Sequence, residues 1–369
     1  MIRFEAVTKS FPDGTVAVGG LSLEAPQGQI TVLVGPSGCG KTTSLRMVNR
    51  MIEPTSGRIT VDGQDTATLE ASELRRGIGY VIQHAGLFPH RTVADNIATV
   101  PRLLGWDKKR SRSTSLELLE RVGLPQAYAD RYPHQLSGGQ QQRVGVARAL
   151  AADPPVMLMD EPFSAVDPVV REQLQDEFLR LQGELGKTIL FVTHDIDEAV
   201  KLGDQVAVLR VGGELAQLSD PARLLGDPHD DFVADFVGRD RGYRGLGFRP
   251  APPVATREEP TVALGSAVDG ADRGDRWVVV VDDERRPVGW VEPARLTGPV
   301  TETDLHRGGT VARAEGSTRA LLDAALSSPS GRGVVVDADG VLLGTVTAAE
   351  VVAAIERPGA GVGPEGAGA

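Results

Sequence analysis

Residues 35–43, Gly-Pro-Ser-Gly-Cys-Gly-Lys-Thr-Thr, contain the spacing of a phosphate-binding loop. Glycines let the backbone curl until several N–H groups point inward, which suits them to hold β- and γ-phosphates. A helix that begins near Lys41 would add its positive end, and the Thr42 hydroxyl is a candidate ligand for Mg²⁺. The apolar, β-branched run at 30–34 predicts the strand that this motif needs in front of it. We therefore expect the nucleotide to contact Gly35, Pro36, Ser37, Gly38, Cys39, Gly40, Lys41, Thr42 and Thr43.

Two carboxylates follow a second apolar run at 156–159. Asp160 is positioned to hold Mg²⁺, directly or through water. The adjacent Glu161 is the candidate general base that polarises the attacking water. A third apolar run, 188–192, leads to Thr193, His194 and Asp195. Buried strands that end in polar residues and alternate with helices predict a parallel α/β sheet with its site at the carboxyl edge.

Residues 136–143 have the sequence LSGGQQQR, and the start of this segment is a second candidate anion site. Ser137 and Gln140 have the spacing of a capping box, which predicts that a helix begins here. Gly138 and Gly139 leave backbone amides exposed at the start of that helix, as an anion requires. A capping box alone would indicate only a capped helix. The phosphate-binding loop earlier in the chain favours a role for this segment at the same nucleotide.

The composition narrows the class of protein. A chain of 369 residues, 41% hydrophobic and 24% charged, is typical of about two to three globular domains. The net charge of −11 and the 4% aromatic content argue against a nucleic-acid-binding surface. Cys39 is the single cysteine, which excludes an intrachain disulfide and a cysteine zinc cage. Without a leader or a membrane-spanning run, we expect a chain in the cytoplasm that could still meet an integral membrane partner.

The character of the sequence changes after about residue 238. Residues 238–260 are rich in Arg and Pro, which predicts a linker or a poorly ordered junction. Residues 278–291 then align without a gap with residues 333–346. Each copy of this repeat predicts strand, turn and strand, and the second copy continues into a helix. The Gly-, Ala- and Pro-rich residues 358–369 are expected to be disordered.

The motifs of residues 1–237 resemble the nucleotide-binding subunits of ATP-binding cassette (ABC) transporters. The resemblance implies a P-loop NTPase α/β fold, with a RecA-like core and a helical subdomain that includes 102–121. It places the Q-loop glutamine on Gln83, as a catalytic and metal-binding residue, and the catalytic switch histidine on His194. An adenine-stacking aromatic falls on Phe11, for which a buried strand position is the alternative. The implied nucleotide contacts also include Ser137, Gly138, Gly139, Gln140 and Asp167.

The same resemblance implies the cofactors and partners. Two subunits would pair head to tail and hold each ATP, with Mg²⁺, between the phosphate-binding loop of one and LSGGQ of the other. Lys41 and Glu161 would then serve ATP hydrolysis. The helical region at about 84–106 would hold a coupling helix of an integral membrane permease, although a generic surface helix pair is the alternative. An extracytoplasmic substrate-binding protein would take part indirectly, and the ATPase would lie peripherally on the cytoplasmic face of the membrane.

Three segments resemble one group of importers more closely. They are residues 47–65, residues 85–106 and the glutamine triplet at 140–142. The group carries quaternary-amine osmoprotectants: glycine betaine, carnitine, choline and proline betaine. An importer for a sugar or an amino acid would share every catalytic residue and remains an alternative. A soluble ABC ATPase without a transport role is the third hypothesis.

The repeat within residues 261–357 resembles a tandem pair of cystathionine-β-synthase-type (CBS) modules, an α+β regulatory domain. The resemblance implies sensing of ionic strength or binding of an adenine nucleotide such as cyclic di-AMP. Nucleotide-binding CBS modules have Thr and, three residues later, an Asp that holds a ribose. The second copy has Thr347 and Glu350 here, and the first has Glu292 and Arg295. We expect no conventional nucleotide site in the first copy, and a structural or dimerising module without a ligand is the alternative.

Overall fold

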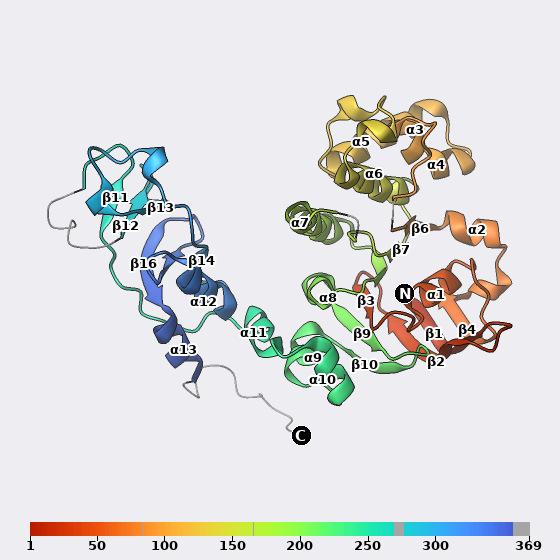
Figure 1. Ribbon diagram of the computed structural model, residues 1–369. Coiled ribbons are helices and arrows are strands. Elements are labelled where there is room, and N and C mark those ends of the chain that lie inside the picture. The colour runs from red at the N-terminus through yellow and green to blue at the C-terminus, as the bar shows by residue number, and fades with distance from the viewer. Residues whose placement is uncertain (84, 165, 269–276, 357–369) are drawn as a thin grey trace, which may run out of the picture. The chain divides into compact units, whose positions relative to one another are not determined.

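The computed structural model describes residues 1–83, 85–164, 166–268 and 277–356. The chain divides into two compact units, Met1–Gly238 and Arg239–Ala369, which are taken separately below (Figure 1). The sequence predicts that the first domain ends at residue 237, one residue before the observed division. The tail expected at 358–369 lies outside the described residues. Within the described ranges, no helix combines the length and the apolar character needed to cross a membrane.

A six-stranded sheet forms the centre of the first unit. Its order is β10 (Leu215–Ser219), β9 (Gln205–Leu209), β3 (Ile30–Val34), β8 (Thr188–Val192), β7 (Val156–Asp160) and β6 (Ile78–Val81). Neighbouring strands from β9 to β6 are parallel, and β10 is antiparallel at the edge. Every residue of β3, β7 and β8 is buried, which explains their uninterrupted apolar runs. The predicted parallel α/β core is therefore confirmed.

A second, antiparallel sheet packs against helix α1 (Lys41–Val48). Its strand order is β2 (Val16–Ala25), β1 (Ile2–Ser10), β4 (Ser56–Val61) and β5 (Gln64–Asp65). Leu45, Met47 and Val48 of α1 are buried in one apolar cluster with residues of both sheets. The helix that follows the phosphate-binding loop is thus fixed between the two sheets, with its first turn at the carboxyl end of β3.

A group of short helices forms the subdomain between β6 and β7 (Figure 1). They are α3 (Val93–Ile97), α4 (Thr99–Leu103), α5 (Lys108–Arg121) and α6 (Gly138–Leu150), preceded by α2 (Ala71–Arg76). Buried Asn96 holds the loop in front of α3, because its side chain bonds Phe88 N and O and the carbonyl oxygens of Arg91 and Thr92. Helices α7 (Pro168–Leu185), α8 (Ile196–Leu202), α9 (Pro221–Gly226) and α10 (Asp231–Val237) complete the unit.

The second unit contains the predicted repeat as two similar three-stranded sheets. In the first copy β12 (Val278–Val281) and β13 (Pro287–Val291) form a hairpin, with β11 (Thr261–Ala263) parallel to β12. In the second, β15 (Arg332–Val336) and β16 (Leu342–Thr347) form a hairpin, with β14 (Val311–Arg313) parallel to β15. Helices α12 (Thr318–Ser327) and α13 (Ala348–Glu356) pack on the second copy, whereas β13 is followed by a 3₁₀ turn, Pro293–Arg295.

The expected linker at 238–260 is instead mostly a packed part of the second unit. It contains α11 (Arg241–Gly245) and a 3₁₀ turn, Leu246–Phe248. Backbone hydrogen bonds pair Arg257 with Thr345 at 2.9 and 3.0 Å. Apolar residues of the segment pack on the core of the second copy: Tyr243, Leu246, Ala251 and Val254. The Arg- and Pro-rich composition predicts a linker. The apolar residues that pack here follow neither a helix nor a strand period, so the sequence pattern does not reveal them.

Candidate functional site

The loop between β3 and α1 has the shape that its sequence predicts. Gly35 has φ of 151°, and a Cβ there would lie 2.3 Å from the carbonyl oxygen of Leu209. Gly40 has φ of 89°, and its Cβ would lie 2.2 Å from the carbonyl oxygen of Ala17. Both positions therefore require glycine. Gly40 is also the N-cap of α1 and has no side chain to cap it, so the first-turn N–H groups are available to an anion.

An open cavity of about 470 Å³ lies against this loop. The buried Lys41 side chain reaches across the loop, where its ammonium donates to Gly35 O at 2.7 Å and to Pro36 O at 3.0 Å. Residues from three strand ends surround the same space. The cavity is lined by Ala17, Ser37, Gly38, Cys39, Gly40, Lys41, Thr42, Thr43, Glu161 and His194. Its cationic and amide groups suit the phosphates of a nucleotide.

Thr42 and Asp160 meet beside the cavity. The Thr42 hydroxyl donates to Asp160 Oδ1 at 2.9 Å, and Arg46 Nη2 lies 3.7 Å from Asp160 Oδ2. Burial raises the pKa of Asp160, and the bond from Thr42 and the charge of Arg46 oppose that rise. A hydroxyl and a carboxylate are the oxygen ligands that Mg²⁺ prefers, with substrate phosphates and water completing its shell. The donor set therefore fits this ion, although the described residues hold no cluster of three or more His, Cys, Asp and Glu.

Glu161 brings together three predicted catalytic residues. Its Oε2 accepts from Gln83 Nε2 at 3.2 Å and lies 3.1 Å from His194 Nδ1. Its backbone N–H donates to Val192 O at 2.9 Å, which ties it to the neighbouring strand end. Glu161 has φ of 46°, a left-handed conformation that costs free energy in a residue other than glycine. The chain thus holds this carboxylate, the glutamine and the histidine at one point on the rim of the phosphate cavity.

The LSGGQ segment begins α6 as predicted. Ser137 is the N-cap, and its hydroxyl accepts from Gln140 N at 3.3 Å while Gln140 Oε1 accepts from Ser137 N at 3.0 Å. This reciprocal pair is the predicted capping box. Helix α6 belongs to the helical subdomain, and among described residues the lining of the phosphate cavity does not include 137–140. Among the described residues, the two segments predicted to bind anions therefore do not line one cavity.

Two further predicted contacts lie outside the cavity lining. Phe11 follows β1, is exposed, and has the Lys9 ammonium 5.3 Å from its ring centroid. The buried-strand alternative for Phe11 is therefore wrong, and an adenine-stacking role stays a prediction. Asp167 caps α7, because its Oδ1 accepts from Val169 N at 3.0 Å. That bond fixes the end of the loop that joins Glu161 to α7. Within this loop, Ala165 lies outside the described residues.

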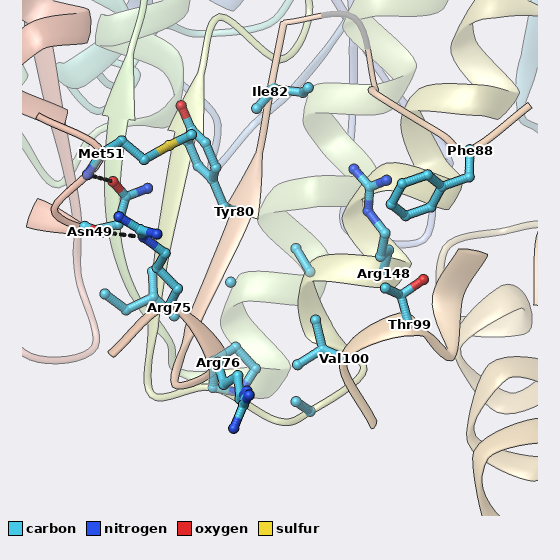
Figure 2. Close-up of a pocket in the computed structure, with 15 residues that line it drawn as sticks. Asn49, Met51, Arg75, Arg76, Tyr80, Ile82, Phe88, Thr99, Val100 and Arg148 are labelled. Carbon is cyan, nitrogen blue, oxygen red and sulfur yellow. Dashed lines mark hydrogen bonds between the residues drawn. The ribbon is translucent and has the colours of Figure 1, made fainter. Parts of the chain in front are cut away.

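A second cavity, of about 380 Å³, opens between the sheet and the helical subdomain (Figure 2). Phe88, Thr99 and Val100 line one side and come from the segment expected to contact a membrane partner. Sequence reasoning missed the opposite side, because its residues come from three separate segments. They are Asn49, Met51, Arg75, Arg76, Ile78, Gly79 and Tyr80, and Arg148 of α6 lies beside Phe88 (Figure 2). His84, within the same expected segment, lies outside the described residues.

In the second unit, the positions that the CBS resemblance would assign to ribose binding make bonds within the chain. Glu350 Oε2 accepts from Thr347 N at 2.8 Å and Thr347 Oγ1 at 2.7 Å, and its Oε1 accepts from Arg257 Nε at 2.9 Å. The Thr347 bonds, followed by Arg257, lower the pKa of Glu350 to about 2. In the first copy, Glu292 pairs with Arg295 at 2.7 Å. Both copies thus use the matching positions for internal bonds.

Comparisons with known proteins show the family to which the chain belongs. A family model described as "ABC transporter" matches residues 18–164. The osmoprotectant import ATP-binding protein OsmV of Salmonella typhimurium is 44% identical, with 94% of each chain covered. The choline transport ATP-binding protein OpuBA of Bacillus subtilis is 42% identical, with 95% of each covered. A solved dimeric ATP-binding cassette, in a post-hydrolysis state with ADP and Pi, is 34% identical with a TM-score of 0.54. It covers 60% of this chain and 99% of that chain.

The fold and the cavity define a P-loop ATPase of the ABC class. The Thr42–Asp160 pair and the Gln83–Glu161 contact lie at strand ends near the phosphate-binding loop. The chain belongs to the family of ABC transporter ATP-binding proteins, among the osmoprotectant-import members of that family.

Proposed function

We propose that this chain hydrolyses ATP to drive an importer of quaternary-amine osmoprotectants, such as glycine betaine, carnitine, choline and proline betaine. The observation that carries the ATPase activity is the convergence of Gln83, Glu161 and His194 on the cavity formed by the Lys41 loop. The solute class is supported by the relatives, whose names cite osmoprotectant import, choline transport and glycine betaine/carnitine/choline transport.

The residues of the site divide the chemistry among them. Thr42, Asp160 and Gln83 would hold Mg²⁺, which when bound offsets phosphate charge as it does in other P-loop ATPases. Loop amides and Lys41 hold the β- and γ-phosphates. Glu161 accepts a proton from water as the water oxygen bonds to the γ-phosphorus and the bond to the β–γ bridging oxygen breaks. His194 lies 3.1 Å from the Glu161 carboxylate and orients it.

A second copy of the chain would complete the ATP site. The amides at the start of α6 are held ready by the capping box at Ser137 and Gln140. Residues 137–140 do not line the cavity beside the Lys41 loop. Head-to-tail pairing would bring the LSGGQ segment of one copy onto the γ-phosphate held by the other. The similar solved cassette is a dimer bound to ADP and Pi, which supports pairing of two copies.

The 380 Å³ cavity would receive side chains from a helix of an integral membrane permease. Phe88 is exposed although it is aromatic, and Met51 across the cavity is exposed as well. Exposed apolar side chains that line a shared cavity favour an interaction surface. Arg75 and Arg76 on the rim would favour an acidic residue on the partner helix. The chain would then lie peripherally on the cytoplasmic face, with an extracytoplasmic substrate-binding protein acting indirectly.

The second unit would regulate transport as a tandem CBS-like module that responds to ionic strength. Its ribose-holding positions are occupied by the Thr347–Glu350–Arg257 and Glu292–Arg295 interactions, which disfavours cyclic di-AMP as the signal. Arg257 and Arg295 are both exposed. Ion pairs at exposed positions weaken as the salt concentration rises. The geometry thus supports a response to salt more than a response to a nucleotide.

Membrane vesicles that contain this chain and its co-purifying permease test the function. ATP-dependent uptake of labelled glycine betaine should be competed by choline or carnitine and unaffected by maltose or amino acids. Competition by maltose or an amino acid alone would identify an importer of another solute. Failure to co-purify with any integral membrane protein would instead favour a soluble ABC ATPase.

A further inference from the structure

The Q-loop turns sharply two residues after Gln83. Ala85 and Gly86 both have φ of 53°, so two consecutive residues adopt the left-handed conformation. For alanine this conformation is unfavourable and persists only where surrounding contacts hold it. The direction of the turn matters for the site, because Gln83 lies two residues before it and donates to Glu161 at 3.2 Å.

Arg148 of α6 holds this turn from the helical subdomain. Its Nη2 donates to Ala85 O and its Nη1 to Gly86 O, both at 2.6 Å. One planar guanidinium therefore binds the two carbonyl groups of the strained pair in a fork. Burial lowers the pKa of Arg148, and the two short bonds compensate for part of that desolvation. The side chain also lines the 380 Å³ cavity beside Phe88 (Figure 2).

Arg148 shares a single helix with the signature segment. Helix α6 runs from Gly138 to Leu150, with Ser137 as its N-cap, so about 16 Å of continuous helix separates the cap from Arg148. The helix also approaches the loop closely at Gly145, where a Cβ would lie 3.5 Å from Ala85 Cα. Because α6 is a continuous helix, a displacement of the Q-loop at Arg148 would also move the start of α6.

We propose that Arg148 is a positioning residue that fixes the Q-loop turn, aims the Gln83 amide at Glu161, and makes the LSGGQ segment move with the loop. The proposal rests on the proposed function for the roles of Gln83 and LSGGQ at ATP. The tether itself depends only on the two bonds from Arg148 to the turn.

Arg143 supplies a matched control on the same helix. Its Nη1 donates to Val122 O at 3.0 Å and to Gly123 O at 3.4 Å, so it also bonds two consecutive backbone carbonyl groups. Those groups lie in the loop after α5 rather than in the Q-loop. Comparison of Arg148→Met with Arg143→Met therefore separates loss of the Q-loop tether from general loosening of α6. Arg148→Lys keeps the charge but loses the fork.

Hydrogen–deuterium exchange and Mg²⁺ titration on the purified full chain test the proposal. In Arg148→Met we expect residues 85–88 to exchange roughly tenfold faster, the factor for one charge-assisted hydrogen bond. The Mg²⁺ concentration for half-maximal ATP hydrolysis should rise by a similar factor, while the Kd for ATP in EDTA stays unchanged. Arg148→Lys should be intermediate, and Arg143→Met should match the wild type in both measurements.

Three outcomes would overturn the proposal. They are unchanged exchange at 85–88 in folded Arg148→Met, an unchanged Mg²⁺ requirement in that variant, and equal changes in Arg143→Met. A Gln83→Ala arm distinguishes failure of the proposed function. If Gln83→Ala keeps the wild-type Mg²⁺ requirement, the assigned role of Gln83 at the metal is wrong. Exchange in Arg148→Met still reports on the tether in that case.

Discussion

Replacement of Glu161 by Gln removes a proton acceptor and almost nothing else. The Gln side chain has the same size, and it can keep contacts with His194 and Gln83, which lie 3.1 and 3.2 Å from the Glu161 carboxylate. A positioned general base contributes about 10²–10⁴-fold to a rate, or roughly 3–5 kcal/mol of barrier. We therefore expect Glu161→Gln to lower the turnover of ATP at least ~100-fold.

Phosphate release at saturating ATP and Mg²⁺ measures this effect, and a separate titration measures the Kd for ATP. The Kd should stay within about twofold of the wild type, because the loop of Lys41 holds the phosphates and is untouched. Glu177→Gln is the matched control, since Glu177 lies on α7 and pairs with Arg180 outside the cavity lining. Near-normal turnover by Glu161→Gln would remove Glu161 from the role of base.

Three other predictions follow from charges in the two units. Burial raises the pKa of Asp160 above the ordinary value of 3.8 for an aspartate. Ionisation of Asp160 therefore lowers the free energy of unfolding as the pH rises above 3.8. Asp160→Asn should therefore raise the melting temperature of the nucleotide-free protein at pH 7, flatten its pH dependence, and abolish Mg²⁺-dependent hydrolysis; an unchanged melting temperature would contradict this. Arg332 Nη2 donates to the buried Glu259 at 2.6 Å. Arg332→Met leaves that charge unpaired and should cost about 3–5 kcal/mol in urea unfolding followed by tryptophan fluorescence, whereas a loss below about 1 kcal/mol would refute the pairing. Calorimetry should detect no binding of cyclic di-AMP, and tight binding would contradict the assignment of the second unit to salt sensing. Arg257→Met, which removes the ion pair with Glu350, should weaken the dependence of uptake on salt concentration.

The parts of the site that depend on local chemistry could be predicted from the sequence. The strand and helix around the Lys41 loop follow from an uninterrupted apolar run and from glycines that the loop requires. The capping box at Ser137 depends on two side chains three residues apart, so it can be predicted without knowledge of the tertiary structure. The carboxylates at 160–161 follow a buried strand, and the parallel sheet brings strand ends to one edge.

The parts that depend on long-range packing could not be predicted. Met51 and Tyr80 share a cavity with Phe88 only because the helical subdomain folds back over the sheet. The bonds from Arg148 to the Q-loop join residues more than 60 positions apart, and arginine on a helix usually indicates a solvated face. The segment 238–260 resembles a linker by composition, although it is anchored by the backbone pairing of Arg257.

Sedimentation velocity of the Glu161→Gln protein, with and without ATP and Mg²⁺, tests the central claim that two copies complete one ATP site. We predict a monomer without nucleotide and a dimer with it. Adding Ser137→Asp should return the protein to a monomer that still binds ATP, since Asp caps a helix as well as Ser but repels the γ-phosphate. A protein that binds ATP and stays monomeric before that second change, or a dimer that survives it, would contradict the account.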